Sequence, residues 1–154
     1  MAPLVEYRVI ATVAEITMHR APVNAIDHQL ARDDIDAYNR ARADDTARAV
    51  ILTSALPTVF SAGVDLKLAL EFDGQALRKF IEVFYYEMHE ALYRLGKPVI
   101  AAVNGHARAA GVTWAGSGAL IMAAEESTWG YPGMHVGILP ALPLLQRPRT
   151  AGSA

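Results

Sequence analysis

The 154-residue sequence contains no cysteine, so neither disulfide bonds nor thiolate chemistry contributes to its structure or activity. It also has no excess of basic residues. Its 14 lysines and arginines face 16 aspartates and glutamates, which gives a formal net charge of −2. Because nucleic-acid binding requires concentrated positive charge, we expect no nucleic-acid partner.

A long hydrophobic run is missing as well. The longest apolar stretch, Val112 to Ala124, is interrupted by Thr113 and Ser117. It falls short of the about 20 apolar residues that a transmembrane helix needs. The first residues, Met1 to Glu6, have no signal-peptide pattern. We therefore expect a cytoplasmic protein without a membrane span.

Several patterns of catalytic or metal sites are absent from the sequence. No P-loop is present, and no Gly-x-Gly-x-x-Gly follows a strand-like run. The five histidines have no His-Glu-x-x-His arrangement or other compact ligand spacing, so we expect no metal site.

What the sequence does contain is a repeated order of strand, turn and helix. Its length and its hydrophobic content of 53% fit one domain with a sizeable core. Alternating or continuous apolar runs predict strands at Val5 to Val9, Val13 to Met18, Ala49 to Thr53, Val99 to Val103 and Leu120 to Ala123. The predicted fold class is α/β.

Two longer helices are predicted between these strands. Asp27 can cap a helix that runs to about Ala43 and buries one face. The clearest helix runs from Gly74 to Leu95 and ends at Gly96. Its apolar residues recur at three- and four-residue steps: Leu77, Phe80, Ile81, Phe84, Met88, Leu92 and Leu95. We expect a short helix between the last two strands.

Two turns rich in small residues follow strand-like runs and precede helical segments. The first is Phe-Ser-Ala-Gly-Val-Asp-Leu at residues 60–66, and the second lies within Asn104 to Gly111. A strand, a tight turn and a helix start leave free backbone N–H groups at one place. Two such turns can hold one carbonyl oxygen from both sides, as an oxyanion hole does.

These turns belong to motifs that resemble the crotonase family, also called the enoyl-CoA hydratase/isomerase family. The first turn resembles the hallmark of the family. Further resemblances follow the order and spacing of the family, at Ala21 to Ile26, Lys97 to Gly105, Trp129 to Pro132 and Val136 to Pro140. The resemblance implies a spiral of ββα units. It also implies an acyl-CoA as substrate or ligand with no separate cofactor, a trimeric or hexameric homo-oligomer, and a role in fatty-acid metabolism.

The end of the chain departs from this resemblance. Residues 1–140 correspond to the crotonase-like core, whereas residues 141–154 diverge and are expected to be irregular, because prolines recur between Pro140 and Pro148. The resemblance implies that the C-terminal helices of the family are missing. Either the gene is truncated or frameshifted, or the chain is a natural short variant.

The resemblance also implies roles for individual residues. The backbone N–H groups of Val64 and Ala110 would be the oxyanion donors. The family commonly has glycine at the second position, and the donor survives there if φ of Ala110 stays negative. Contacts to the acyl-CoA are implied for Ala21, Val23, Ser61, Ala62, Gly63, Asp65 and Leu66.

The two acids of the hydratase fall at the positions of Thr113 and Gly133, and neither residue is an acid. The resemblance therefore argues against ordinary hydration or isomerisation. Tyr131 and His135 flank Gly133 and can substitute as proton-transfer groups. The alternative is that His135 is a surface or interface histidine.

Positive charges near the first motifs have two interpretations. His19, Arg20 and Lys67 can meet a CoA phosphate, or they can belong to solvated loops. The sequence thus leaves three hypotheses open: an acyl-CoA enzyme with weak or altered chemistry, a non-catalytic acyl-CoA-binding pseudoenzyme, and an inactive truncated remnant.

Overall fold

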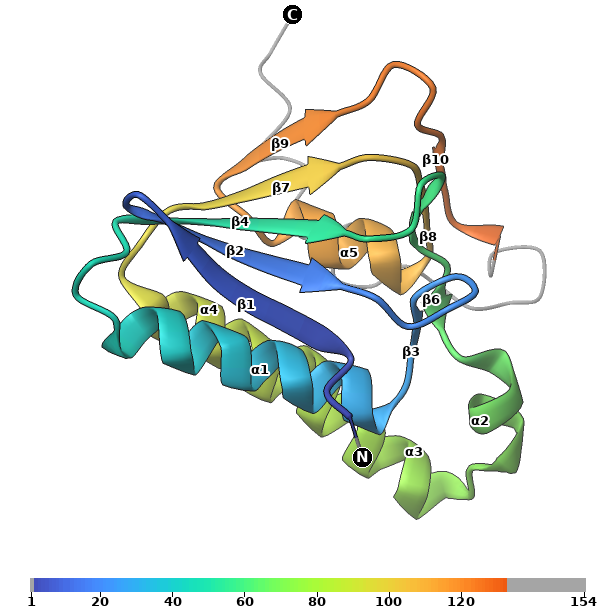
Figure 1. The fold of residues 1–154 in the computed structure, drawn as a ribbon. Helices are drawn as coiled ribbons and strands as arrows, with labels where there is room; N and C mark the ends of the chain where they lie inside the picture. Colours follow the sequence, from blue (N-terminus) through green and yellow to red (C-terminus); the bar gives the residue numbers. More distant parts are fainter. Residues whose placement is uncertain (1, 133–154) are drawn as a thin grey trace, which may run out of the picture.

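The computed structural model describes residues 2–132, which form an α/β fold built on a five-stranded sheet (Figure 1). The strand order is β1-β2-β4-β7-β9. Its members are β1 (Val5–Ile10), β2 (Val13–Met18), β4 (Ala49–Ser54), β7 (Val99–Val103) and β9 (Leu120–Ala123). β1 and β2 form an antiparallel hairpin, and the other pairs are parallel. The predicted strands are confirmed.

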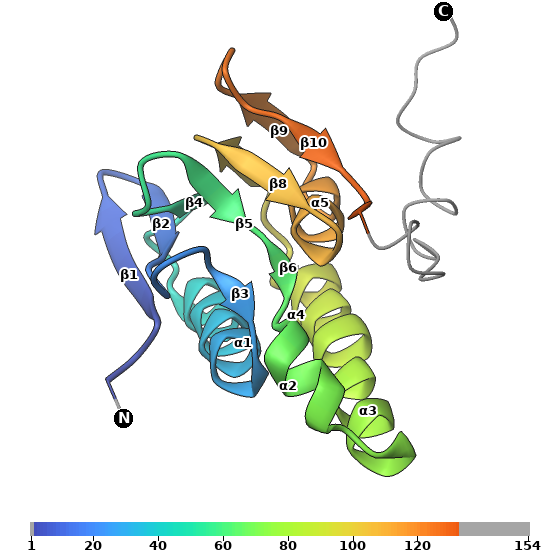
Figure 2. The same cartoon turned by 90° about the vertical axis from the view of Figure 1, so that its right-hand side faces the viewer.

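Three helices cover one face of this sheet: α1 (His28–Ala43), α4 (Met88–Leu95) and α5 (Ala110–Gly116) (Figures 1 and 2). The Asp27 carboxylate caps α1 by accepting a hydrogen bond from the Leu30 N–H at 2.8 Å, as predicted. One face of α1 is buried, which allows a largely polar helix to pack on the sheet.

The long helix predicted from Gly74 to Leu95 exists but is not regular. It consists of α3 (Gly74–Ile81), a π-helical segment η1 (Glu82–Glu87) and α4. Of its periodic apolar residues, Phe80, Phe84 and Met88 are buried, whereas Leu77 and Ile81 are 43% and 37% exposed. The wider π turn changes which side chains face the sheet, and Val83 is buried instead. Gly96 ends the helix with φ of +68°, as predicted.

Short strands that were not predicted as separate elements complete the fold, together with a short helix after the first glycine turn, where a helical segment was expected. They are β3 (Ala25–Ile26), β5 (Val59–Ser61), β6 (Gly63–Val64), α2 (Leu66–Glu71), β8 (His106–Arg108) and β10 (Trp129–Gly130). β10, β8 and β5 form a parallel sheet, and β3 pairs with β6. Strands this short give too little periodicity to be recognised in a sequence.

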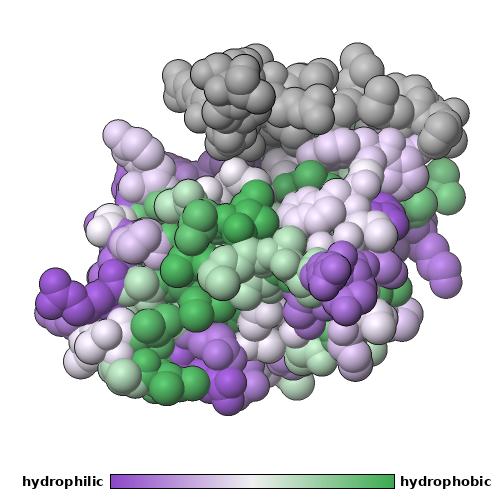
Figure 3. Space-filling view, turned by 90° about the horizontal axis from the view of Figure 1, so that it is seen from above, coloured by the Kyte–Doolittle hydropathy of each residue, from purple (hydrophilic) through white to green (hydrophobic). Residues whose placement is uncertain are grey.

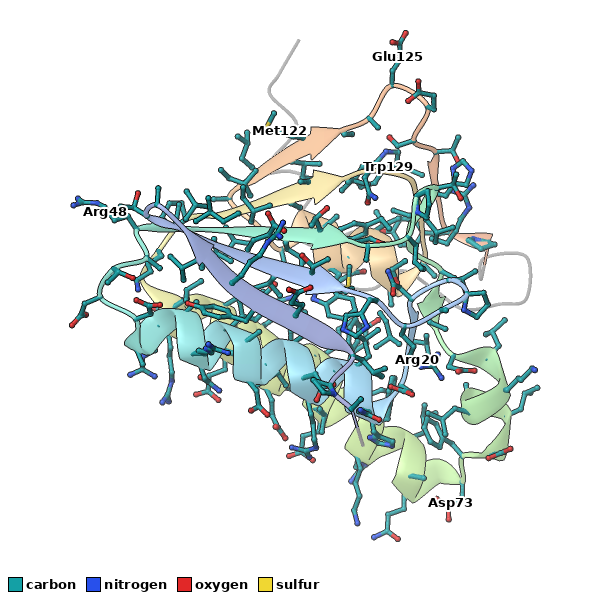
Figure 4. All side chains as sticks on the ribbon, viewed as in Figure 1. Arg20, Arg48, Asp73, Met122, Glu125 and Trp129 are labelled. Carbon is teal, nitrogen blue, oxygen red and sulfur yellow. The ribbon has the colours of Figure 1, made fainter. Side chains whose placement is uncertain are left out.

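The core lies between the five-stranded sheet and the helices. Its largest fully buried side chains are Trp114, Tyr38, Phe60, Phe80, Phe84, Ile16, Met18, Ile26, Leu30, Leu52, Met88 and Val50. The edge strand β9 contrasts with this core, because Leu120, Ile121 and Met122 are 55%, 43% and 62% exposed. Figure 3 shows hydrophobic surface on the side of the molecule seen from above, and Figure 4 shows Met122 pointing outward from β9.

Candidate functional site

The first glycine turn is held from one side by the segment that precedes α1. The Ala62 N–H donates to the Val23 carbonyl at 3.0 Å, and the Asp65 N–H donates to the Ile26 carbonyl at 2.9 Å. Between these two bonds, Gly63 has φ of +87°, a conformation that favours glycine. The backbone around Val64 is therefore fixed on both sides by one segment that is distant in sequence, Val23 to Ile26.

Arg20 fastens this turn to its surroundings (Figure 4). Its Nη2 donates to Asp65 Oδ2 at 2.8 Å, its Nε lies 2.9 Å from Asp27 Oδ2, and its Nη1 donates to the Ala25 carbonyl at 2.8 Å. Two carboxylates thus compensate the charge of Arg20. Because both carboxylates already neutralise the Arg20 guanidinium, this arrangement does not support the interpretation that Arg20 contacts a CoA phosphate.

Asp65 links the same turn to the start of α2. Its carboxylate accepts hydrogen bonds from the Lys67 and Leu68 N–H groups at 3.1 and 3.4 Å. Burial alone would raise the pKa of Asp65. The hydrogen bonds from Arg20, Leu68 and Lys67, together with the charge of Arg20, outweigh burial and lower this pKa below its ordinary value.

A buried polar network lies beneath the turn. The Asn24 side-chain amide donates to Ser54 Oγ at 2.8 Å and to the Phe60 carbonyl at 2.9 Å. The Ser61 hydroxyl donates to the Asn24 carbonyl at 2.8 Å and accepts from the Gly63 N–H at 3.1 Å. Because Ser61 is fully buried, its side chain supports the turn rather than facing a ligand.

The two glycine turns touch each other through their backbones. A Cβ atom built on Gly63 would lie 3.1 Å from the Ala110 nitrogen and 2.8 Å from the Arg108 carbonyl oxygen. A Cβ atom on Gly111 would lie 2.6 Å from the Ser61 carbonyl oxygen. Only glycine permits this approach at both places, so the turn sequences bring Gly63 and Ala110 together.

Ala110 is the first residue of α5, and its N–H has no acceptor within the helix. The next donors, the N–H groups of Val112 and Thr113, bond to the Ala109 carbonyl at 3.0 and 3.4 Å. The preceding residue, Ala109, has φ of +46° and ψ of −117°, a backbone conformation that is unusual for a residue with a side chain. Ala110 itself is not among the residues with positive φ.

Thr113 lies one turn further along α5 and is only 2% exposed. The next residue, Trp114, donates its indole N–H to Asp34 Oδ2 at 2.8 Å, which ties α5 to α1. Asp34 is fully buried, and burial raises its pKa well above the ordinary value, against the opposing effect of the Trp114 hydrogen bond. The sequence pattern gave no sign of this carboxyl group in the core.

A second, partly buried polar contact joins the C-terminal end of α5 to α4. His89 Nε2 lies 3.0 Å from Ser117 Oγ, and the Ser117 hydroxyl donates to the Thr113 carbonyl at 2.8 Å. Burial lowers the pKa of His89, and the Tyr85 carbonyl opposes this shift in part. No cluster of three or more metal-ligating side chains exists within residues 2–132.

The remaining predicted residues lie at the rim of this region or outside it. Ala21 and Leu66 are exposed, and Val23 and Ala62 are half-buried. Tyr131 follows β10, which pairs with β8 next to the second turn. Gly133, His135 and the 141–154 segment lie outside the described residues. Within the described part of the chain, no helix is long and apolar enough to cross a membrane.

Comparison with known proteins supports a single family. The model of the family described as "Enoyl-CoA hydratase/isomerase" matches residues 8–154. Carnitinyl-CoA dehydratase of Proteus mirabilis is 33% identical over 129 residues, which cover 84% of this chain and 49% of the relative. A Mycobacterium tuberculosis protein named as a (7aS)-7a-methyl-1,5-dioxo-2,3,5,6,7,7a-hexahydro-1H-indene-carboxyl-CoA hydrolase is 35% identical over 135 residues, which cover 88% of this chain and 54% of the relative.

Solved structures agree with the sequence matches. DspI of Pseudomonas aeruginosa has a TM-score of 0.89 at 26% identity, covering 99% of this chain and 62% of that structure. An enoyl-CoA hydratase from Bacillus anthracis has a TM-score of 0.89 at 25% identity, covering 98% of this chain and 59% of that structure. The chain spans about half the length of the relatives that it matches in sequence. It belongs to the enoyl-CoA hydratase/isomerase family and has the α/β crotonase fold.

Proposed function

We propose that this protein binds an acyl-CoA thioester, with the thioester oxygen between the backbone N–H groups of Val64 and Ala110. The observation that carries the proposal is the approach of Gly63 to the Ala110 nitrogen, where a Cβ atom would lie only 3.1 Å away. Relatives named as a carnitinyl-CoA dehydratase and a carboxyl-CoA hydrolase act on CoA thioesters, which supports the same ligand class here.

The surroundings of the turn fit this proposal. The segment from Ala62 to Leu66, with Ala21 and Val23 beside it, is the proposed contact region for CoA, and the buried Ser61 side chain supports it from beneath. Val23 accepts the hydrogen bond of the Ala62 N–H, so its backbone belongs to the same rigid unit. A donor fixed before the ligand arrives needs little reorganisation when negative charge develops on the oxygen.

We propose that the chemistry at this site differs from ordinary enoyl-CoA hydration. Thr113 occupies the position of one acid, and a hydroxyl group there can hold a water molecule but cannot act as a base near neutral pH. Tyr131 and His135 remain candidates for altered proton transfer on an enolate. The lack of an acid at Thr113 favours, as the second candidate function, a non-catalytic acyl-CoA-binding pseudoenzyme or an inactive remnant.

The binding site is tested by calorimetric titration of Gly63→Ala with an acyl-CoA. The positive φ of Gly63 and the 2.8 Å approach to the Arg108 carbonyl oxygen leave no room for a methyl group. We expect affinity to weaken by up to about tenfold as the Val64 N–H is displaced. Gly74→Ala is the matched control, because a Cβ atom there meets nothing within 4 Å.

A second variant keeps this test decisive if Gly63→Ala unfolds. Ala110→Pro deletes the proposed donor at the first position of α5, where helices tolerate proline. A folded Ala110→Pro protein that binds acyl-CoA with unchanged affinity would sink the proposed site. Circular dichroism establishes which variants are folded.

An assay of crotonyl-CoA hydration distinguishes altered chemistry from ordinary hydratase chemistry. We expect the purified chain to lack turnover at the order of 10 per second that is typical of enzymes, because Thr113 supplies no acid. The loss of enoyl thioester absorbance measures the reaction, and calorimetric binding of the same ligand is the control. Hydration at an ordinary rate would contradict the proposal that the proton-transfer groups are missing.

A further inference from the structure

A hydrogen bond in the core joins α1 to the helix that carries the second proposed oxyanion donor. The indole N–H of Trp114 on α5 donates to Asp34 Oδ2 on α1 at 2.8 Å. Both side chains are buried, at 1% and 0% exposure. Trp114 comes four residues after Ala110, so the two residues lie on one face of α5, one helical turn apart. The bond to Asp34 therefore acts close to the Ala110 N–H.

The aim of the Ala110 N–H depends on how α5 is oriented. The first N–H groups of a helix point along the helix axis, so a tilt of α5 redirects them. α5 has only seven residues, and its N-cap residue, Ala109, makes no side-chain capping bond. A helix this short is not stable without tertiary contacts, so its packing decides its orientation.

Two contacts from neighbouring helices reach the Trp114 indole ring. The Phe84 ring of η1 packs against it edge-on, with centroids 5.9 Å apart, and Asp34 accepts its N–H. A contact between apolar rings tolerates sliding, whereas a hydrogen bond requires a narrow range of distance and angle. The bond to Asp34 is therefore the contact that specifies where the middle of α5 lies relative to α1.

The same helix α1 also holds the first glycine turn. Its N-cap Asp27 lies 2.9 Å from Arg20, and Arg20 donates to Asp65 at 2.8 Å, directly after the first proposed donor. Asp27 and Asp34 are two helical turns apart, which is about 10 Å along the axis of α1. α1 is therefore a common frame for both proposed oxyanion donors.

A carboxyl group is an unusual choice for joining two helices in a core. Burial raises the pKa of Asp34 well above its ordinary value, and its Oδ1 makes no hydrogen bond within the described residues. Apolar side chains at positions 34 and 114 would pack α1 against α5 without this loss of hydration. A buried polar bond selects one arrangement of the two helices, which points to a need for exact placement.

We propose that Asp34 is a positioning residue of the thioester site, which acts through Trp114 to align the Ala110 N–H with the Val64 N–H. This inference rests on the proposed function, because the alignment matters only if a thioester oxygen lies between the two N–H groups. Asp34 itself touches no ligand. Its loss frees α5 to tilt and misaims one donor.

The test is calorimetric titration with octanoyl-CoA and with S-octyl-CoA, the thioether analogue that lacks the carbonyl oxygen. We expect Asp34→Leu to lower the affinity for octanoyl-CoA about fivefold and to leave S-octyl-CoA binding unchanged, because one hydrogen bond to the oxygen is lost. A general loss of structure would weaken both ligands alike. Asp34→Asn keeps an acceptor for Trp114 and should bind as the parent does. Asp36→Leu, at an exposed position of α1, is the matched control.

Trp114→Phe removes the donor of the same hydrogen bond and should reproduce the effect of Asp34→Leu. The double variant Asp34→Leu/Trp114→Phe should lose no more affinity for octanoyl-CoA than either single variant, because all three lack the same bond. Additive losses would mean that the two residues act separately, and they would overturn the proposal.

An NMR measurement tests the same link without a substitution in the core. The sequence has two tryptophans, so the indole N–H resonance that remains in Trp129→Phe belongs to Trp114. It should shift with octanoyl-CoA and not with S-octyl-CoA. If the parent prefers octanoyl-CoA but this resonance stays unmoved, or if Asp34→Leu keeps the preference, the inference is overturned while the proposed function stands. If the parent has no preference for the thioester, the proposed function itself fails.

Discussion

At the scale of single residues, Asp34 stands out because its carboxyl group is fully buried. It lies on α1 in the core, with one oxygen bonded to Trp114 and the other without a hydrogen bond inside residues 2–132. Tyr38, on the next turn of the same helix, is also fully buried. A buried carboxylate costs far more than a buried carboxylic acid, so the folded state holds the proton.

The raised pKa of Asp34 predicts a particular dependence of stability on pH. The unfolded chain releases this proton above about pH 4, whereas the raised pKa of Asp34 in the folded chain moves its release to higher pH. The stability that Asp34 contributes is therefore complete below that pH and is lost as pH rises toward the folded pKa.

We expect Asp34→Asn to be more stable than the parent by at least about 1 kcal/mol at pH 7, and equally stable near pH 4. The amide still accepts the Trp114 hydrogen bond and never has to ionise. Urea unfolding at several pH values measures the difference, with the exposed Asp36→Asn on the same helix as control. Parallel stability curves for parent and Asp34→Asn would contradict a buried neutral acid.

The residues that support the site differ in how far the sequence could predict them. The Gly63 turn and the Ala110 position follow from motifs, because a backbone turn demands particular small residues. Asn24 lies inside a predicted motif, but its bonds to Ser54 and Phe60 depend on tertiary contacts. The partners of Arg20 and His89 are likewise set by packing between distant segments, and no local pattern encodes that packing.

At the scale of elements, the first turn depends on how β3, α1 and α2 meet. Arg20 bonds to Ala25 in β3, to the cap of α1 and to the cap of α2. One side chain therefore joins three elements, although each pair of elements shares few other contacts. The helix periods in the sequence predicted α1, whereas α2 is too short to have a recognisable period.

We expect Arg20→Gln to lower the free energy of unfolding by about 1–3 kcal/mol, because it leaves two partly buried carboxylates without their cation. Amide hydrogen exchange should accelerate in residues 63–71, where the turn and α2 lose their anchor. Arg8→Gln is the control, since Arg8 pairs with Glu15 on the surface with its own side chain 55% exposed. If Arg20→Gln and Arg8→Gln lowered the free energy of unfolding equally, Arg20 would not anchor the turn and α2.

At the scale of the whole molecule, apolar surface remains uncovered on one helical side. Leu77, Ile81 and Tyr86 line a shallow groove of about 700 Å³ with Arg78 and Glu82. Leu70, on the neighbouring α2, is 88% exposed. The apolar periodicity between Gly74 and Leu95 does not show which of these side chains are exposed, because the π turn changes which side chains face the sheet.

A contiguous apolar surface of this kind promotes association. We expect the purified chain to self-associate or aggregate, and the double variant Leu77→Ser/Ile81→Ser to do so less. Size-exclusion chromatography with light scattering measures the effect across concentrations. Met122→Ser on β9 controls for loss of any exposed apolar group. A monodisperse monomer of the parent chain, without binding of an apolar dye, would contradict this expectation.

The order of strands in the sheet also governs how the chain acquires its structure during synthesis. The β1–β2 hairpin closes as soon as Met18 is available, because its register pairs neighbouring residues. Each later parallel pair must wait for an intervening helix, and β9 joins β7 only after α5 exists. Non-local parallel pairing slows folding. The nascent chain therefore leaves the edge of β7 unpaired until β9, which ends at Ala123, has left the ribosome.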